Sequence, residues 1–341
     1  MNKLHVGIVG AGRIGKVHAE TVAFALPDVE IVSITDINRE AAVQLAERCG
    51  IPNVAPSSDE ILADPRVEAV LICSSTDTHA GLIAAAARAG KQIFCEKPIA
   101  LDLARIDSAL EAVAAAGVKL QIGFNRRFDA NFARVKRAVT TGEIGTPRLM
   151  HIVSRDPAPP PLSYVKVSGG MFLDMTIHDF DMARYLMADE VEEIFVSGGV
   201  MVDPEIGAAG DLDTAVIVLR FRNGAIGTID NCRQAAYGYD QRVEILGSRG
   251  KIATENCYPN QAVVSTGYEV RTDLPLNFFM ERYRESFAAE LRAFAEAVIH
   301  DTPTPVNGED GRIPVVLGLA ARKSYEEHRP VRLEEMKAAI A

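Results

Sequence analysis

The sequence predicts an α/β protein with two domains: a doubly wound parallel sheet, followed by a domain with an antiparallel or mixed sheet. Three observations predict this fold class. The chain has 341 residues, which is roughly twice the size of a common domain. Its first third alternates short β-branched runs with longer alanine-rich stretches of helical character. Its second half contains consecutive strands joined by turns, a pattern typical of antiparallel pairing.

The first domain is expected to span residues 1–124. A strand, a helix and a strand repeated in order imply parallel strands with right-handed crossovers and helices on both faces of the sheet. This is the doubly wound architecture of nucleotide-binding domains. The predicted strands are 4–9, 30–35, 69–73, 92–95 and 120–122, and the predicted helices are 13–24, 39–49, 79–88 and 103–115.

The second domain is expected to span residues 125–341. The proline run at 157–161 cannot form a helix or a central strand, so it predicts a stiff extended connection. Asn223 and Gly224 form a dipeptide that favours a hairpin turn. The predicted strands are 191–202, 213–221, 225–231, 241–246 and 251–253. The predicted helices are 171–187, 279–299 and 310–328, and the last of them can pack back on the first domain.

Composition and charge exclude several classes of function. Lys plus Arg number 36 and Asp plus Glu number 46, which gives 36 − 46 = −10. A chain this acidic repels a phosphate backbone, so no nucleic-acid partner is expected. No stretch approaches the roughly 18 apolar residues of a membrane-spanning helix, so no membrane partner is expected either. The N-terminal apolar run is followed at once by glycines, which favours a strand over a signal peptide.

The cysteines indicate a reducing compartment. Their number is odd and they contain no CxxC pair, so we expect reduced thiols in a cytoplasmic protein. Two of them lie in apolar runs, where a free thiol behaves as a small buried hydrophobe. The five are Cys49, Cys73, Cys95, Cys232 and Cys257.

A glycine-rich turn follows the first predicted strand and begins the first predicted helix. It has the pattern GxGxxG, from Gly10 to Gly15. In this context Gly10 permits a tight turn, Gly12 lets the backbone approach a pyrophosphate, and Gly15 lets the helix pack closely on the strand. The helix N-terminus supplies amide donors and the positive end of the helix dipole. The turn therefore predicts a dinucleotide site.

An acidic residue ends the second predicted strand, at the distance that such a site requires. Asp36 lies 36 − 12 = 24 residues after Gly12, close to the spacing at which a carboxylate accepts hydrogen bonds from the adenosine ribose. A carboxylate at this position repels the 2′-phosphate of NADP, so NAD is the expected cofactor. Arg39 lies nearby, and an arginine can accommodate that phosphate, so NADP stays open as an alternative.

A lysine follows the fourth predicted strand, in the sequence Glu96-Lys97-Pro98. The carboxyl edge of a doubly wound sheet carries the ligands, so a lysine in this turn can reach a substrate oxygen. The alternative is a solvated surface lysine.

The predicted helix 171–187 carries acids around a histidine. Asp174, His178 and Asp181 have the spacing i, i+4 and i+7, which places them on one face of an ideal helix. A carboxylate one turn from an imidazole can fix its tautomer and support its protonated form, as a general base requires. The alternatives are a surface acid–histidine pair and a zinc site. No further His or Cys cluster completes such a site, so no metal is expected.

In this order and spacing, the motifs resemble the glucose–fructose oxidoreductase and inositol dehydrogenase family of nicotinamide-dependent enzymes. The resemblance covers nearly the whole chain and is carried by the glycine turn, by Glu96-Lys97-Pro98 and by Asp174 with His178. The stretches 154–161, 168–170 and 175–181 are similar, more narrowly, to bacterial inositol 2-dehydrogenases. The resemblance implies a Rossmann domain and an α/β domain with a large open, mostly antiparallel sheet, through which subunits associate as homotetramers.

The resemblance also implies the roles of individual residues. Lys97 and His178 would meet the reacting hydroxyl, with Asp174 supporting the site, and the Lys97–Pro98 bond would be cis. Substrate contacts would come from Lys97, Arg127, Asp156, Asp174, His178 and Tyr237. Cofactor contacts would come from Gly10, Ala11, Gly12, Arg13, Ile14, Gly15, Asp36, Ile37, Arg39, Ser74, Ser75, Thr76, His79, Glu96 and Lys97.

The resemblance implies NAD-dependent oxidation of a ring secondary alcohol to a ketone, with myo-inositol and 2-keto-myo-inositol as the first candidates, in inositol catabolism. His178 would accept the hydroxyl proton and Lys97 would donate to the oxygen, although Lys97 is an alternative base. Another polyol or sugar, such as scyllo-inositol or a hexose, is the alternative within the enzyme class. A non-catalytic dinucleotide sensor is the alternative outside it, but a sensor has no need for both Lys97 and His178.

Overall fold

The computed structural model describes residues 3–338, and these fold into two compact units. The first unit contains the chain up to Phe128 together with Glu285–Val315, and the second contains Asp129–Arg284 and the chain from Val316 onwards. The predicted boundary after residue 124 lies close to Phe128. The segment Glu285–Val315, in contrast, was expected in the second domain and belongs to the first unit. The predicted helix 310–328 is accordingly divided between the two units at Val315.

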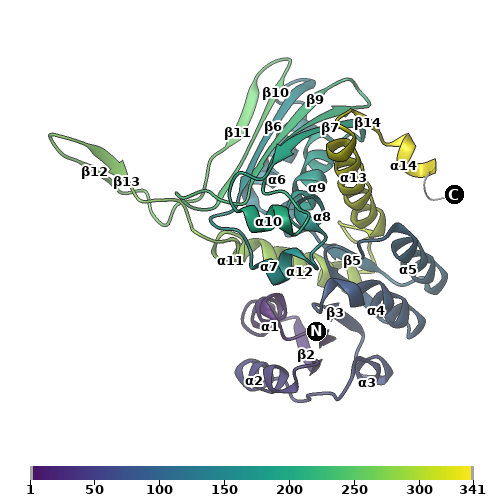
Figure 1. The fold of residues 1–341 in the computed structure, drawn as a ribbon. Coiled ribbons are helices and arrows are strands. Elements are labelled where there is room, and N and C mark those ends of the chain that lie inside the picture. Colours follow the sequence, from purple (N-terminus) through teal and green to yellow (C-terminus); the bar gives the residue numbers. More distant parts are fainter. Residues whose placement is uncertain (1–2, 339–341) are drawn as a thin grey trace. The chain divides into compact units, whose positions relative to one another are not determined.

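The first unit contains a five-stranded sheet in the order β2-β1-β3-β4-β5, and all four neighbouring pairs are parallel (Figure 1). This is the predicted doubly wound sheet, and each predicted strand is confirmed to within one residue at either end. The strands are β1 (Leu4–Val9), β2 (Val29–Thr35), β3 (Ala69–Ile72), β4 (Gln92–Glu96) and β5 (Leu120–Gly123).

Helices connect these strands, and local chemistry sets their ends. Asn38 and Asp102 cap the helices that follow them with side-chain oxygens, and Gly50 and Gly117 end the same two helices in the left-handed conformation. A short helix at 58–63 was missed by the sequence analysis. The helices are α1 (Arg13–Ala25), α2 (Arg39–Cys49), α3 (Ser58–Ala63), α4 (Thr76–Arg88), α5 (Leu103–Ala116) and the 3-10 helix η1 (Asn125–Phe128).

A C-terminal helix completes the core of the first unit. Leu291 and Phe294 of α12 (Arg284–Ile299) belong to the same hydrophobic cluster as Leu4, Val6 and Ile8 of β1. Burial of these apolar side chains is the reason that α12 belongs to this unit rather than to the second one. The last predicted helix was expected to pack back on the first domain. The C-terminal segments that belong to the first unit are α12 and the start of α13 (Gly308–Glu327).

The second unit contains a seven-stranded sheet in the order β11-β10-β6-β9-β8-β7-β14. The β6–β9 pair is parallel and the other five pairs are antiparallel, which confirms a large, mostly antiparallel sheet. Asn223 and Gly224 turn the chain between β8 and β9, with Gly224 at φ 87°. The strands are β6 (Pro147–Arg155), β7 (Val191–Gly199), β8 (Thr214–Phe221), β9 (Ile226–Cys232), β10 (Asp240–Gly247), β11 (Lys251–Thr254) and β14 (Val331–Arg332).

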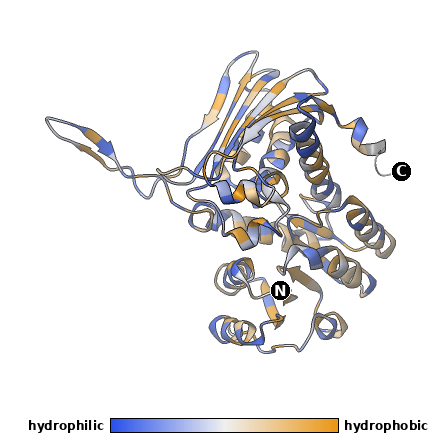
Figure 2. Ribbon diagram, in the orientation of Figure 1, coloured by the Kyte–Doolittle hydropathy of each residue, from blue (hydrophilic) through white to orange (hydrophobic). Residues whose placement is uncertain are grey.

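One face of this sheet is covered by helices. α9 (Thr176–Met187) contacts β6 and β9, and α6 (Ala130–Thr140) packs on α9. Hydrophobic and hydrophilic residues alternate along the strands, as expected for a sheet with one buried face (Figure 2). In β8 the alternation buries Ile217 and Leu219 and exposes Val216 and Val218.

Two predicted helices are each divided in the structure. The predicted helix 171–187 is α8 (Gly170–Asp174) and α9, separated at Met175. There the amide of His178 bonds to the Met175 carbonyl, three residues back instead of four, so the regular ladder is interrupted. The predicted helix 279–299 is α11 (Phe279–Arg282) and α12. Tyr283 separates them at φ −113°, where its buried ring packs edge-on against Tyr239.

Several elements lie where no prediction was made. They include α6 and β6, and a projecting hairpin of β12 (Val263–Ser265) and β13 (Val270–Thr272) that forms a sheet of its own (Figure 1). The remaining short helices are α7 (Leu162–Val165), α10 (Pro204–Ala208) and α14 (Glu334–Ala338). The proline run at 157–161 forms neither helix nor strand, as predicted. Within residues 3–338 no helix is long and apolar enough to cross a membrane.

Candidate active site

The glycine turn between β1 and α1 has the packing that the motif predicts. Gly10 has φ +111°, and a Cβ on it would lie 2.6 Å from the backbone of Cys73. A Cβ on Gly15 would lie 2.1 Å from the Gly10 carbonyl oxygen, so only glycine lets the helix pack this closely on the turn. A Cβ on Gly12 would meet no atom of the described part of the chain within 4 Å. The space beside Gly12 is thus available to a ligand rather than filled by protein.

The carboxylate of Asp36 is fixed against this turn. Its Oδ2 accepts a hydrogen bond from the Ala11 amide at 2.6 Å, and its Oδ1 accepts one from the Asn38 amide at 2.7 Å. Among residues 3–338 no side chain caps the N-terminus of α1, so the dipole end that a pyrophosphate would face is not covered by a capping group. The donor set and the open space at Gly12 fit a dinucleotide.

Other predicted cofactor residues surround the turn. Ile14 is half-buried, whereas Arg13 and Ile37 are exposed, Ile37 completely. Arg39 is also exposed, and its Nη1 lies 3.5 Å from the Val54 carbonyl oxygen. An apolar side chain as exposed as Ile37 suits contact with a ligand that has an aromatic face.

The loop after β3 brings together four predicted cofactor residues. The Ser74 hydroxyl bonds to that of Thr78 at 2.6 Å, and Ser75 and Thr76 lie at the N-terminus of α4. His79 is buried, with Nδ1 2.8 Å from the Pro98 carbonyl oxygen and Nε2 3.0 Å from that of Ser74. His79 therefore ties this loop to the turn that contains Lys97.

Lys97 follows the last residue of β4, and the Lys97–Pro98 peptide bond is cis, as the resemblance implied. Lys97 is half-buried, whereas Pro98 and Glu96 are buried. Glu96 accepts a bond from the ring of His18, with Nε2 and Oε1 2.6 Å apart. The contacts of Glu96 and His79 with the cofactor stay predictions, and the structure adds that both residues bond to the protein itself.

Asp174 and His178 lie in the second unit, on either side of the division between α8 and α9. The spacing of an ideal helix therefore does not govern their relation, which corrects the predicted single face of Asp174, His178 and Asp181. Both Asp174 and His178 are half-buried, and Asp181 is fully buried. The Asp174 carboxylate accepts a bond from the Tyr164 hydroxyl at 2.9 Å and from Arg233 at 3.4 Å.

Two groups that the sequence analysis missed hold this region. Arg233 is 1% exposed and reaches both Asp174 and Asp211. Asn231 of β9 accepts a bond from the Thr176 hydroxyl at 2.6 Å and donates one to Asp179 at 2.9 Å, which fixes the start of α9. The available signal was a pair of polar residues at the end of a predicted strand: Asn231 is the last residue of predicted strand 225–231, and Arg233 follows two residues later.

The three other predicted substrate residues lie in different surroundings. Arg127, in the first unit, donates to Asp310 at 2.9 Å. In the second unit, Asp156 follows β6 and is half-buried. The Tyr237 hydroxyl donates to Asp240 at 2.5 Å and accepts from Arg155. Burial and the Asp240 carboxylate raise the pKa of Tyr237, so this hydroxyl stays protonated within its network.

Two family comparisons cover both units. Residues 4–124 match an oxidoreductase family with an NAD-binding Rossmann fold, and residues 132–253 match the GFO/IDH/MocA C-terminal domain.

Individual relatives are similar over nearly the whole length. A myo-inositol 2-dehydrogenase of Thermotoga maritima is 50% identical, over 98% of this chain and 99% of its own. An inositol 2-dehydrogenase of Rhizobium meliloti is 44% identical, over 96% of this chain and 98% of its own. The solved scyllo-inositol dehydrogenase of Lactobacillus casei, with bound NAD(H) and scyllo-inositol, is 29% identical, with a TM-score of 0.91 over 98% of this chain and 100% of its own.

The glycine turn with its fixed acid, the lysine before a cis proline and the matches across both units agree with one another. This chain belongs to the GFO/IDH/MocA family and is an NAD-dependent oxidoreductase that acts on CH–OH groups.

Proposed function

We propose that the protein oxidises a ring secondary alcohol of myo-inositol to the ketone, giving 2-keto-myo-inositol and NADH. The observation that carries this choice of substrate is the 50% identity to the Thermotoga maritima myo-inositol 2-dehydrogenase over 98% of the chain. Oxidation of the alcohol needs an ammonium, an imidazole and a carboxylate. These groups are supplied by Lys97, His178 and Asp174.

The reaction removes a hydride from the alcohol carbon and a proton from its oxygen, so that a C=O bond forms. NAD, when bound, supplies the hydride acceptor. His178 accepts the hydroxyl proton as a neutral imidazole. Lys97, as an ammonium, donates a hydrogen bond to the same oxygen while negative charge develops on it.

Asp174 supports the imidazolium that forms on His178. A carboxylate favours the charged imidazole, and this effect depends on where the carboxylate is held. Tyr164 and Arg233 both bond to Asp174, and Arg233 is itself almost fully buried. These contacts support a role for Asp174 as a fixed charge rather than as a mobile acid.

Polyol recognition is assigned to three further residues. Arg127, Asp156 and Tyr237 carry groups that bond to hydroxyls, and each is placed here by the resemblance. Arg127 is anchored by Asp310, and Tyr237 by Asp240 and Arg155, so both side chains are pre-oriented. Preorganised donors and acceptors bind a polyol at a lower entropic cost than mobile ones.

The second candidate substrate is scyllo-inositol, because the solved Lactobacillus casei relative was determined with that molecule and NAD(H). myo-Inositol and scyllo-inositol differ in the orientation of one ring hydroxyl, so the same catalytic groups serve either molecule. Hexoses are the third class to be tested.

We propose further that the protein is a homotetramer that works in cytoplasmic inositol catabolism. The face of the seven-stranded sheet opposite α9 exposes apolar side chains on neighbouring strands. Leu246, Leu149 and Ile226 lie side by side on β10, β6 and β9, and Val216 and Val218 lie on β8. An exposed apolar group of this kind favours subunit contact. The free thiols support a reducing compartment.

The test is NADH absorbance with purified protein and NAD, in parallel with myo-inositol, scyllo-inositol and glucose. We expect the highest kcat/KM with myo-inositol. A higher kcat/KM with scyllo-inositol or glucose would reassign the substrate, and no NADH from any polyol would overturn the proposed reaction.

A further inference from the structure

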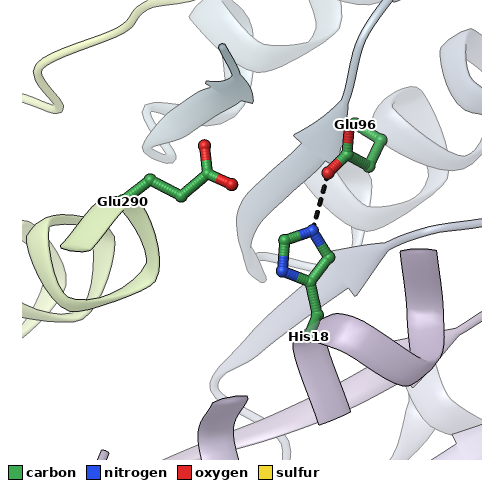
Figure 3. A group of neighbouring side chains, drawn as sticks. All are labelled: His18, Glu96 and Glu290. Carbon is green, nitrogen blue, oxygen red and sulfur yellow. Dashed lines mark hydrogen bonds and ion pairs between the residues drawn. The ribbon is translucent and has the colours of Figure 1, made fainter. Parts of the chain in front are cut away.

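A group of three ionisable side chains lies inside the first unit, and the reaction proposed above does not use it. His18 comes from α1, Glu96 from the end of β4 and Glu290 from α12. One ligand atom from each lies within 4.8 Å of the others. His18 and Glu290 are 0% exposed and Glu96 is 8% exposed. Figure 3 shows the Glu290 carboxyl directed toward the pair formed by His18 and Glu96.

The surroundings of this cluster are apolar and closely packed. The rings of Phe94 and Phe287 meet the His18 imidazole edge-on, with centroids 5.1 Å and 5.7 Å away. A Cβ on Gly123 would lie 3.1 Å from the Glu96 carboxyl, so the glycine makes room for that side chain. A charge in such a place is costly unless it is paired.

Only part of the cluster is satisfied by protein. His18 Nε2 and Glu96 Oε1 form one hydrogen bond of 2.6 Å. Among residues 3–338, no hydrogen-bond partner is found for His18 Nδ1, for either oxygen of Glu290 or for Gln121 Oε1. Gln121 is close to Glu290, because its Nε2 donates to the Glu290 backbone carbonyl at 2.8 Å. Unsatisfied polar atoms that are buried together are typical of a place where a small polar species bridges them.

The balance of charge in the cluster bears on whether the Glu290 carboxyl is ionised or protonated. Two carboxylates and an imidazolium would leave a net charge of −1 in an apolar interior. Burial, and then the charge of Glu96, raise the pKa of Glu290 well above its ordinary range, which favours the neutral carboxyl that can donate a hydrogen bond. The thiol of Cys73 interacts with both carboxyl groups and that of Cys95 with Glu96, and burial raises the pKa of both thiols, so they add no charge.

We propose that His18, Glu96 and Glu290 form an internal binding site for one water molecule, in which Glu290 is a hydrogen-bond donor, and that this site positions Lys97 through the adjacent Glu96. Glu290 and His18 Nδ1 donate to the water, which donates in turn to Glu96 and Gln121. Such a water has the two to four polar partners that buried waters need. The role for Lys97 rests on the function proposed above.

A divalent cation is the competing occupant, since an imidazole and two carboxylates also suit a metal. The distance between His18 and Glu96 argues against it. Ligands held about 2.1 Å from a metal lie about 3 Å or more from each other. The observed 2.6 Å is the length of a charge-assisted hydrogen bond.

The first experiment tests the site itself on the full-length protein. At pH 7–8 we expect an infrared carbonyl band of a protonated carboxylic acid in the wild type and its loss in Glu290→Gln. Metal analysis of the purified protein should find far less than one ion per chain, and a crystal structure should show one water between the three side chains. An ionised Glu290, or one bound metal per chain, would overturn the proposal.

The second experiment tests the positioning role with two isosteric replacements. Glu290→Gln keeps a donor and an acceptor and should keep kcat within about twofold of the wild type. Glu290→Met has a similar length but no polar group. We expect it to lose about tenfold in kcat while the KM for NAD changes by less than about twofold, because a misplaced lysine affects the chemical step. Thermal unfolding shows whether each variant is folded.

The outcomes separate the two parts of the proposal. Should Glu290→Met not fold, Gln121→Met removes one partner of the water and should lower kcat in the same selective way. The positioning role would be overturned by a wild-type kcat in the folded Met variant. It would also be overturned if Glu290→Gln lost as much kcat as Glu290→Met. If the wild type oxidises no inositol, the proposed function fails, whereas the infrared and metal measurements still decide the water site.

Discussion

Asp36 and His178 are the residues whose chemistry is easiest to isolate, because each is assigned one task. Asp36 is held by the amides of Ala11 and Asn38, so its carboxylate is directed before a ligand arrives. His178 lies in the first turn of α9, directly after the break at Met175, in a segment anchored by Asn231. Selectivity for the cofactor and acceptance of the proton can therefore be altered separately.

Replacing Asp36 should change the choice of cofactor. Asp36→Ser removes the charged acceptor for the ribose diol, at a cost of roughly 3 kcal/mol or about two decades in NAD affinity, and relieves repulsion of the NADP phosphate. Titration calorimetry with both cofactors measures the ratio of affinities. Asp59→Ser is the matched control, since Asp59 is an exposed acid in the first turn of α3. An unchanged NAD/NADP ratio in Asp36→Ser would show that Asp36 does not select the cofactor.

Replacing His178 should change the pH profile of alcohol oxidation. Only the neutral imidazole accepts a proton, so kcat/KM in the wild type should fall as the pH is lowered. His178→Ala should lose about 10²–10⁴-fold in activity, and its remaining activity should no longer show this acidic limb. The measurement is kcat/KM from pH 5 to 10 for both proteins. An identical acidic limb in the variant would assign the proton to another group, with Lys97 as the first alternative.

The turn between β1 and α1 contains one glycine that the fold needs and another that, we expect, cofactor binding needs. In this turn Gly10 is required by the fold, because its φ is +111° and a Cβ would overlap the backbone of Cys73. Gly12 has a φ of −70° and open space beside it, so the fold tolerates a side chain there.

We therefore expect opposite effects from two alanine substitutions. Gly10→Ala should lower the free energy of unfolding by about 2–4 kcal/mol. Gly12→Ala should leave stability within about 1 kcal/mol but weaken NAD binding by at least about tenfold, because its methyl group enters the space of the pyrophosphate. Thermal unfolding and NAD titration of both variants check this. Equal NAD affinity in Gly12→Ala and the wild type would show that the pyrophosphate does not bind there.

The elements that could be predicted from the sequence are those fixed by local pattern. Alternating strands and helices predicted the parallel sheet to within a residue at each strand end, and Asn223-Gly224 predicted the turn between β8 and β9. The break at Met175 could not be predicted in this way, because the apolar pattern continues through it. It depends on contacts with Asn231, which is 55 residues away from Thr176.

The buried cluster of His18, Glu96 and Glu290 could not be predicted from local sequence pattern either. Glu290 lies on α12 between Phe287 and Leu291, and an acid on an apolar helix face is a signal that could have drawn attention to it. Its partners His18 and Glu96 are distant in sequence, however, and only the tertiary structure brings the three together. Local pattern suggested chemical roles for Lys97, Asp174 and His178 but left structural alternatives open for each, and the family resemblance decided between them.

At the scale of the whole molecule, the exposed face of the seven-stranded sheet should hold the subunits together. Val216→Glu and Ile226→Glu each place a charge on that face, and burying it in an interface costs several kcal/mol unless it is paired. We expect both variants to form smaller species than the wild type in light scattering. Phe24→Glu is the matched control, since Phe24 is 70% exposed on α1 of the first unit. A wild-type mass for both sheet variants would exclude this face as the interface.

The role of Lys97 in alcohol oxidation is tested by NADH formation from myo-inositol by the wild type, by Lys97→Met and by Lys3→Met. Lys97→Met keeps the length of the side chain but removes its charge and donors, so it should still bind NAD and lose about 10²-fold or more in turnover. Lys3 is an exposed lysine paired with Glu30, and its replacement should leave turnover unchanged. Near-wild-type turnover in a folded Lys97→Met protein would show that the Lys97 ammonium does not take part in the reaction.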